Sequence, residues 1–145
     1  MYFVDREKIE TILVFFENQI SLFLSQKNWS SPIEKAALER LTQMMLESVL
    51  DVGNAMIDGF IMRDPGSYED IIEILTDEKV ISQENSNRLK ILIQNRKALV
   101  QNYTEINHEE LVKQFADHIE ALSQFAVNVR EYLINELGPV SAFKN

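Results

Sequence analysis

Apolar residues recur at intervals of three and four along most of the chain, which is the spacing that places side chains on one face of an α-helix. The first such stretch runs from about Asp5 to Gln26. No alternating pattern typical of β-strands competes with the helical one, so we expect an all-α fold. The predicted buried positions of this first helix are Ile9, Ile12, Leu13, Phe16, Ile20, Phe23 and Leu24.

The second predicted helix has a clear start and a clear end. Ser31 can cap its first turn, Pro32 suits the first helical position, and Glu34 completes a capping box with Ser31. The helical spacing then continues to about Arg63, where Asp64-Pro65-Gly66 interrupts it. This helix is therefore the longest element that the sequence predicts.

Three later segments begin with the same kind of capping residue. Ser67 caps a short helix that extends through about Glu78, Ser82 caps a fourth helix, and Asn107 opens a fifth. Together with the first two, these segments predict a helical bundle of four long helices plus one short helix.

The length of the chain indicates one domain with its own core. Its 145 residues are too few for two domains of ordinary size. Gly138-Pro139 ends the last predicted helix, because glycine and proline together stop helical structure. We therefore expect a single domain over residues 1–138 and a C-terminal tail over residues 139–145.

Composition narrows the functions that the chain can have. The formal net charge of −9 opposes nonspecific binding to nucleic acid or to anionic membranes, because such binding depends on clustered cations. There is no cysteine, and no apolar stretch is long enough to span a bilayer. We expect a cytoplasmic protein that has no contact with membranes and carries no metal or other cofactor.

One charged residue interrupts an apolar stripe in the fourth helix. Leu89, Leu92, Arg96, Leu99 and Tyr103 are spaced by three, four, three and four residues, so Arg96 occupies a position where leucine would be expected. A buried guanidinium is costly unless a carboxylate, a phosphate or a subunit interface compensates its charge. Arg96 is therefore either part of a functional site or a structural, salt-bridged arginine.

The second helix carries a narrow polar line that could face Arg96. Glu47, Asp51, Asn54 and Asp58 are spaced by four, three and four residues, and apolar residues surround this line. The line either faces a cleft or forms an ordinary solvated face. Paired carboxylates can also bind Mg²⁺, but no nucleotide-binding motif accompanies them, so a metal site is not expected.

The fourth helix is also the most basic stretch of this acidic chain. Its cations are Arg88, Lys90, Arg96 and Lys97. They could form a small phosphate-binding patch, or they could be the ordinary cations of a solvated helix.

Three segments, taken in order, resemble a known family. Residues Glu47–Asn54, Asp64–Tyr68 and Asn95–Tyr103 are similar in order and spacing to the HepT-like branch of the HEPN proteins. These are bacterial helical domains, often encoded as toxins beside a minimal nucleotidyltransferase. The segment from Asp64 to Glu73 is similar to solitary Gram-positive members of this branch.

The resemblance implies an antiparallel helical bundle that forms a homodimer around a cleft. Active members of the family are metal-independent endoribonucleases. Their motif is an arginine, then a histidine after four to six residues, then a tyrosine two positions further on. The arginine would stabilise charge on the scissile phosphate, and the histidine would move the proton of the attacking 2′-hydroxyl. In some members the nucleotidyltransferase attaches AMP to the tyrosine and so silences the toxin.

Carried over to this chain, the motif departs from the family pattern at its histidine. Arg96 matches the arginine and Tyr103 the tyrosine, but Gln101 stands at the histidine position, and Lys97 stands where many members have asparagine. Glutamine can hydrogen-bond a phosphate but cannot exchange a proton near neutral pH. His108 is too far along the chain to replace the histidine.

Three interpretations of the site remain open at this point. The first is a ribonuclease weakened by the missing base, with Arg96, Gln101 and Tyr103 in the catalytic positions and Glu47, Asp51, Asn54 and Lys97 in support. The second is a catalytically inactive dimer that binds RNA, a nucleotide or a partner protein in the same cleft. The third gives Arg96 only a structural role, paired with Glu47 or Asp51. Tyr103 is the candidate for modification, and a minimal nucleotidyltransferase antitoxin is a possible partner.

Overall fold

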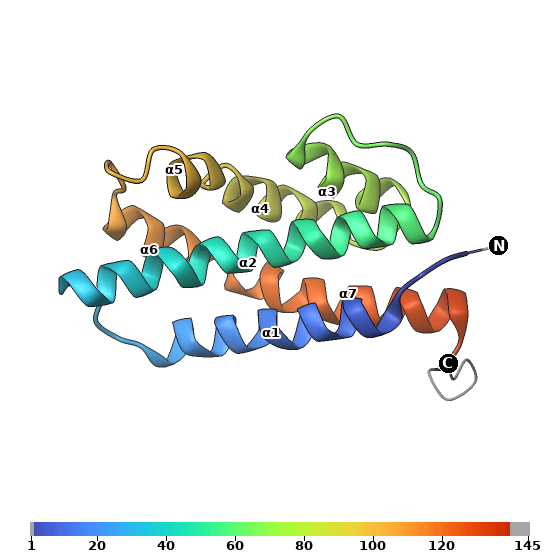
Figure 1. Ribbon diagram of the computed structural model, residues 1–145, viewed down its shortest axis with the longest axis horizontal. Coiled ribbons are helices and arrows are strands. Elements are labelled where there is room, and N and C mark those ends of the chain that lie inside the picture. Colours follow the sequence, from blue (N-terminus) through green and yellow to red (C-terminus); the bar gives the residue numbers. More distant parts are fainter. Residues whose placement is uncertain (1, 140–145) are drawn as a thin grey trace.

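The computed structural model describes residues 2–139, and all regular secondary structure within that range is helical (Figure 1). The antiparallel pair of long helices at the N-terminal end leads into shorter helices and then a long C-terminal one. The helices are α1 (Arg6–Ser25), α2 (Pro32–Gly59), α3 (Tyr68–Asp77), α4 (Gln83–Ile93), α5 (Arg96–Val100), α6 (His108–Asp117) and α7 (Ile119–Leu137).

Helix α2 lies at the centre of the bundle. It packs against α1 on one side and against α3, α5 and α6 on the other, while α7 closes the core by packing against α1, α4 and α6 (Figure 1). Because α2 is covered by so many neighbours, it buries residues around most of its circumference. These residues are Leu38, Thr42, Met45, Leu46, Ser48, Val49, Leu50, Val52, Gly53, Met56, Ile57 and Gly59.

The predicted helix starts are confirmed. The Ser31 hydroxyl accepts a hydrogen bond from the backbone N–H of Glu34, and the Glu34 carboxylate accepts one from the backbone N–H of Ser31. Ser67, Ser82 and Asn107 cap α3, α4 and α6 through the same kind of side-chain acceptor. Local capping chemistry therefore determines where these four helices begin.

The prediction of four long helices plus one short helix is wrong in its count, because the fourth and fifth predicted helices are each broken. The fourth ends at Ile93 and resumes at Arg96 as α5. Between them, the Asn95 side chain donates hydrogen bonds to the Leu92 carbonyl oxygen at 3.1 Å and to Gln114 Oε1 at 2.7 Å. An asparagine that bonds local backbone competes with the helical ladder, so the chain turns there.

Two further predictions are corrected, one about a helix boundary and one about a buried residue. The fifth predicted helix is interrupted at His118, which separates α6 from α7. In α1 the prediction that Leu24 is buried is wrong, because Leu24 is exposed. Its neighbour Phe23 is the residue that faces inward, where it contacts Trp29 and Phe115.

Helix α2 ends at Gly59, before the predicted stop at Asp64-Pro65-Gly66. Ile61 adopts a left-handed backbone conformation with φ of 55°, and the Met62 N–H donates to the Ile57 carbonyl oxygen at 2.9 Å. This is the hydrogen-bond pattern of a Schellman C-cap. Glycine usually occupies the left-handed position, which is why the sequence gives no signal for a helix end here.

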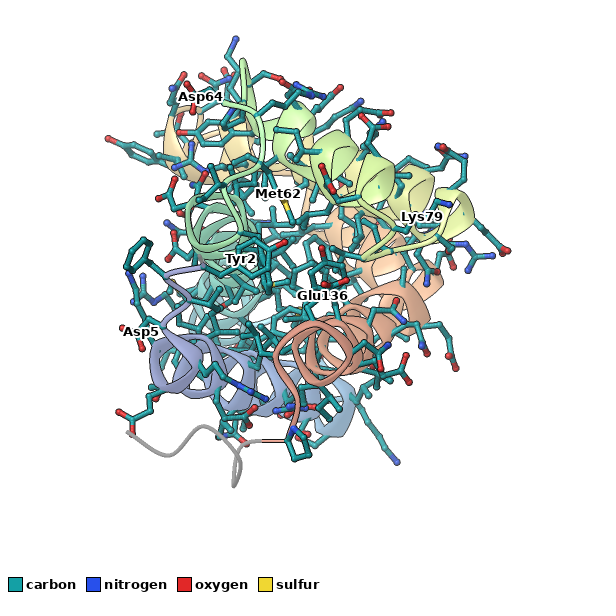
Figure 2. All side chains as sticks on the ribbon, turned by 90° about the vertical axis from the view of Figure 1, so that its right-hand side faces the viewer. Tyr2, Asp5, Met62, Asp64, Lys79 and Glu136 are labelled. Carbon is teal, nitrogen blue, oxygen red and sulfur yellow. The ribbon has the colours of Figure 1, made fainter. Side chains whose placement is uncertain are left out.

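The N-terminal segment covers the end of α2, as Figure 2 shows around Tyr2 and Met62. The Phe3 N–H donates to the Gly59 carbonyl oxygen at 3.0 Å, and the Tyr2 ring meets Phe60 edge-on. A side chain at Gly59 would lie within 3.0 Å of the Val4 backbone, so only glycine allows this approach. The segment thereby joins α2 to the rest of the bundle.

Two other sequence expectations concern the ends and the exterior of the chain. The predicted tail, residues 139–145, lies outside the described residues except for Pro139. Among residues 2–139, no helix is both long enough and apolar enough to cross a membrane.

Replacing Ile61 with glycine is expected to stabilise the fold. A left-handed conformation costs a non-glycine residue about 1–2 kcal/mol, and the flexibility of glycine in the unfolded chain offsets about 0.5–1 kcal/mol of this gain. Because the Ile61 side chain is exposed, little packing is lost. Urea unfolding of Ile61→Gly should show a free energy of unfolding up to about 1 kcal/mol higher than wild type. Ile61→Ala is the control, and an alanine variant more stable than the glycine variant would contradict the explanation.

Candidate functional site

Arg96 lies at the first position of α5 and is held by a carboxylate from the central helix. Its Nε donates a hydrogen bond to Glu47 Oε1 at 2.7 Å. The two side chains are only 21% and 24% exposed, so much of each charge is removed from water. Of the two candidate partners on the polar line of α2, Glu47 and Asp51, Glu47 is the one that pairs with Arg96.

An aromatic ring holds the same guanidinium from a second direction. Arg96 Cζ lies over the Tyr68 ring, 4.3 Å from its centroid, in cation–π geometry. Within residues 2–139, neither Nη atom of Arg96 has a hydrogen-bond partner. Glu47 and Tyr68 therefore orient the guanidinium and leave its two terminal nitrogens available to another group.

Tyr68 is not among the site residues that the sequence predicts. It is only the last residue of the Asp64–Tyr68 segment that resembles the family. Tyr68 is the first residue of α3, directly after its cap Ser67, and half of its surface is exposed. The one signal in the sequence was an aromatic residue directly after a helix cap, and this signal does not reveal the contact with Arg96.

The loop before Tyr68 is fixed by one carboxylate, that of Asp70. Arg63 donates two hydrogen bonds to it, at 2.8 and 2.9 Å, and the Gly66 N–H donates a third at 2.8 Å. The Arg63 guanidinium, and after it the Gly66 N–H, lower the pKa of Asp70 to about 2. These bonds tie the end of the α2–α3 connection to the first turn of α3 and so position Tyr68.

Arg96 and Tyr68 open onto a cleft of about 580 Å³ between α3 and the α4–α5 region. The cleft brings together three of the predicted site residues, Arg96, Lys97 and Gln101. It combines two cations, one aromatic ring and two primary amides, which are groups able to bind phosphate oxygens and heteroaromatic rings. The lining residues are Ser67, Tyr68, Glu69, Ile93, Gln94, Arg96, Lys97 and Gln101.

Tyr103 is not part of this cleft lining. Helix α5 ends at Val100, and Tyr103 lies in the following turn with 63% of its surface exposed. The prediction of one continuous stripe from Leu89 to Tyr103 is therefore wrong. The prediction assumed one unbroken helix, but the helix ends at Ile93 and a new one begins at Arg96.

Most of the polar line on α2 faces solvent. Asp51, Asn54 and Asp58 are exposed, and only Glu47 reaches Arg96. Partial removal of its carboxylate from water, and then the nearby Glu47 carboxylate, raise the pKa of Asp51. Of the two interpretations of this line, the solvated face describes all of it except Glu47. Within residues 2–139, no group of three His, Asp or Glu side chains could hold a metal ion.

The basic stretch is largely neutralised by ion pairs. Arg88 pairs with Glu84, and Lys90 pairs with Glu73 across the α3–α4 contact. Of the four cations, Lys97 is the one without an ion pair in the described part of the chain. The stretch is thus not a continuous phosphate-binding patch, and its available positive charge is concentrated at the cleft.

The first histidine after the cleft residues is engaged elsewhere. His108 Nε2 lies 2.7 Å from Glu39 Oε2, an interaction that joins the start of α6 to α2. Neither His108 nor His118 is among the residues that line the cleft. The cleft therefore contains no imidazole from the described residues of this chain.

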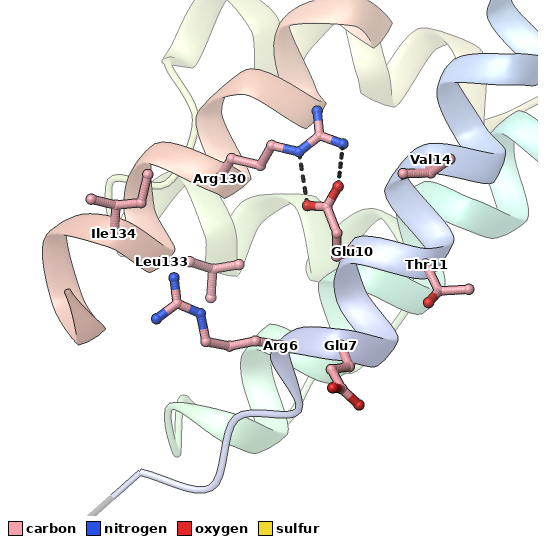
Figure 3. A pocket seen from close by; sticks show the side chains of 8 residues that line it. All are labelled: Arg6, Glu7, Glu10, Thr11, Val14, Arg130, Leu133 and Ile134. Atoms are coloured by element: carbon pink, nitrogen blue, oxygen red, sulfur yellow. Dashed lines mark hydrogen bonds and ion pairs between the residues drawn. The ribbon is translucent and has the colours of Figure 1, made fainter. Parts of the chain in front are cut away.

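A second groove, of about 730 Å³, lies between α1 and α7 and contains none of the predicted site residues (Figure 3). Arg130 spans its rim with hydrogen bonds of 2.8–2.9 Å to Glu10 and Glu17. Arg6 donates to the Gly138 carbonyl oxygen at 2.8 Å. Because both arginines already have partners, we interpret this region as a structural contact between the first and last helices.

The all-helical fold of the described residues is HEPN-like. Residues 7–129 match the family model described as Ribonuclease HepT-like. The chain belongs to the HepT-like ribonuclease family, as the sequence resemblance implied.

Relatives of known structure share this fold. The chain is 54% identical to "Putative RNase YutE" of Bacillus subtilis (strain 168) over 144 residues, which cover 99% of this chain and 100% of that protein. The solved structure of YutE, described as a cytosolic protein of unknown function, superposes with a TM-score of 0.95 over 98% of this chain and 99% of that one.

A more distant structure is similar in fold alone. It is a tri-AMPylated HEPN toxin of Shewanella oneidensis in complex with an MNT antitoxin. This chain is 20% identical to it, with a TM-score of 0.75 over 85% of this chain and 96% of that one.

Removing the Asp70 carboxylate is expected to lower the thermal stability in a pH-dependent way. The folded-state pKa of about 2 lies below the ordinary value of 3.8, so the contribution is present above about pH 4 and is lost as the pH falls toward 2. Asp70→Asn should therefore have a lower Tm than wild type at neutral pH, and the difference should shrink below pH 4 and be lost as the pH falls through 2. Asp77→Asn, which removes a longer and more exposed contact of Arg63, is the matched control. An equal effect of both variants at neutral pH would contradict this role for Asp70.

Proposed function

We propose that this HepT-like protein acts on RNA at the cleft around Arg96 and cleaves it slowly, without a metal ion. The observation that carries the proposal is the state of Arg96. Its guanidinium is fixed by Glu47 and Tyr68, and its two Nη atoms are without partners within residues 2–139. A planar guanidinium presented in this way suits two parallel hydrogen bonds to a phosphate group.

Two neighbours support a phosphate at this position. Lys97 adds a second cation at the cleft, and Gln101 adds an amide that can donate a hydrogen bond. By the family motif, Arg96 would stabilise the charge that develops on the scissile phosphate. Glu47 would keep the guanidinium in place while the phosphate binds, and Asp51 and Asn54 would act only from the neighbouring surface of α2.

Slow cleavage is proposed because Gln101 occupies the position of the motif histidine. An amide cannot accept the proton of the 2′-hydroxyl near neutral pH, and loss of a general base typically lowers the rate by about 10²–10⁴. The same residue favours the second candidate function, an inactive dimer that binds RNA, a nucleotide or a partner protein without cleaving it. The two functions share the cleft and differ only in whether the chemical step occurs.

Tyr103 is proposed as a modification site rather than as a cleft residue. It is well exposed in the turn after α5, so its hydroxyl is accessible to another enzyme. The Shewanella oneidensis toxin, which is AMPylated and bound to an MNT antitoxin, supports a nucleotidyltransferase as the partner and AMP as the group transferred. We place the protein in the cytoplasm, in line with the description of YutE as cytosolic.

Cleavage of a mixed RNA pool in the presence of EDTA tests the catalytic role. Arg96→Ala should lower the slow wild-type rate by about 10²–10³, because the charge on the phosphate is no longer stabilised. Gln101→His should raise the rate by about 10² or more, because it restores a general base. Gln94→His, which places a histidine elsewhere in the same cleft, is the matched control and should not do so.

Two results of this experiment separate the candidate functions. An inert wild type that binds RNA through Arg96 and gains cleavage only as Gln101→His identifies the inactive binding protein. RNA binding that is unchanged by Arg96→Ala would contradict both.

The homodimer that the family resemblance implies is a separate proposal. Light scattering at micromolar concentration should give about twice the mass of one 16.8 kDa chain. A monomer over this concentration range would contradict it.

A further inference from the structure

The Tyr68 ring has a second use beyond supporting Arg96. The guanidinium lies over the ring, yet half of the residue remains exposed, and Tyr68 is among the residues that line the cleft. We propose that Tyr68 is a stacking platform for an unpaired nucleobase, so that the cleft takes single-stranded RNA. This inference rests on the proposed function, because it assigns a substrate class to the same cleft.

The two binding groups of the cleft, the Arg96 guanidinium and the Tyr68 ring, lie next to each other. Arg96 Cζ lies 4.3 Å from the centre of the Tyr68 ring, so a phosphate on the Nη atoms and a base on the ring would be immediate neighbours. A nucleotide carries these two groups on one sugar. The cleft therefore presents a cation and an aromatic ring side by side, as a nucleotide presents its phosphate and its base.

Stacking on Tyr68 requires a base with a free face, so the RNA strand must be single. In a duplex the faces of each base are covered by the bases above and below it, and a half-exposed tyrosine cannot reach them. Single-stranded nucleic acid is commonly bound by an aromatic side chain that takes a base, next to cations that take the backbone. Tyr68 together with Arg96 and Lys97 has this composition.

The remaining lining supports a base rather than a bare phosphate. Gln94 and Gln101 are primary amides, each with donors and an acceptor that match the edge of a base. Gln94 makes only a long contact of 3.4 Å to Glu69, so it can exchange this contact for one to the ligand. Glu69 places a carboxylate at the same wall, which discourages a second phosphate there and favours an uncharged base.

The test must separate stacking from simple support of Arg96. Fluorescence anisotropy should compare three probes of equal length: oligoadenylate, the same strand paired with oligouridylate, and an abasic ribose-phosphate strand. Wild type should bind oligoadenylate about tenfold more tightly than either of the other two, the range expected for one stacked base. Tyr68→Leu should remove this preference, because it should lower affinity for oligoadenylate by about tenfold more than it lowers affinity for the abasic strand.

Matched variants complete the measurement. Tyr68→Phe keeps the ring and should restore the preference for oligoadenylate. Tyr2→Leu removes another half-exposed tyrosine, one that packs on Phe60, and serves as the control. If Tyr68→Leu weakens binding of the oligoadenylate and the abasic strand equally, Tyr68 only supports Arg96 and the stacking proposal is overturned.

A spectroscopic reading gives independent evidence of stacking. Trp29 is the only tryptophan of the chain, so Tyr68→Trp in a Trp29→Phe background places the single indole at the cleft. Oligoadenylate should quench its fluorescence, and the abasic strand should not. Binding of oligoadenylate without quenching contradicts the proposal and leaves the function at Arg96 intact. A wild type that binds none of the three probes contradicts the proposed function as well.

Discussion

The ion pair between Glu47 and Arg96 connects the centre of the bundle to the cleft, and the arrangement of the site depends on it. Helix α2 is buried around most of its circumference, so the backbone that carries Glu47 is held in a fixed position. The pair is largely shielded from water, where removing one partner leaves the other uncompensated. The orientation of the guanidinium thus follows from the packing of the whole core, and Tyr68 adds the second restraint.

The distribution of charge in this acidic chain is compatible with the proposed binding of a phosphate at the cleft. Arg88 and Lys90 are paired with carboxylates on α4 and α3 and contribute little external field. At the cleft the balance differs, because Lys97 is unpaired within residues 2–139 and Arg96 keeps its terminal nitrogens available. The net charge of −9 opposes nonspecific binding of nucleic acid elsewhere on the surface.

The parts of the structure that local chemistry decides could be predicted from the sequence. The capping side chains of Ser31, Ser67 and Asn107 act within one helical turn, so their residues reveal the helix starts. The spacing on two amphipathic helices left Glu47 and Asp51 as alternative partners of Arg96, and the structure shows the pair with Glu47. The turn at Asn95 and the contact of Tyr68 with Arg96 could not be predicted, because each depends on residues distant in sequence, Gln114 in the first case.

The shortness of α5 has a consequence for how the site forms during folding. A helix of five residues cannot nucleate alone, since the entropy lost in the first turn exceeds what one turn of hydrogen bonds returns. Helix α5 is therefore ordered only when docked on α2, and its amide hydrogens should exchange with solvent earlier than those of the core. The position of Arg96 therefore depends on tertiary contacts and not on the local sequence of α5. A ligand that binds Arg96 and Lys97 stabilises this segment in its folded form only, so occupancy of the cleft and order in α5 are thermodynamically linked.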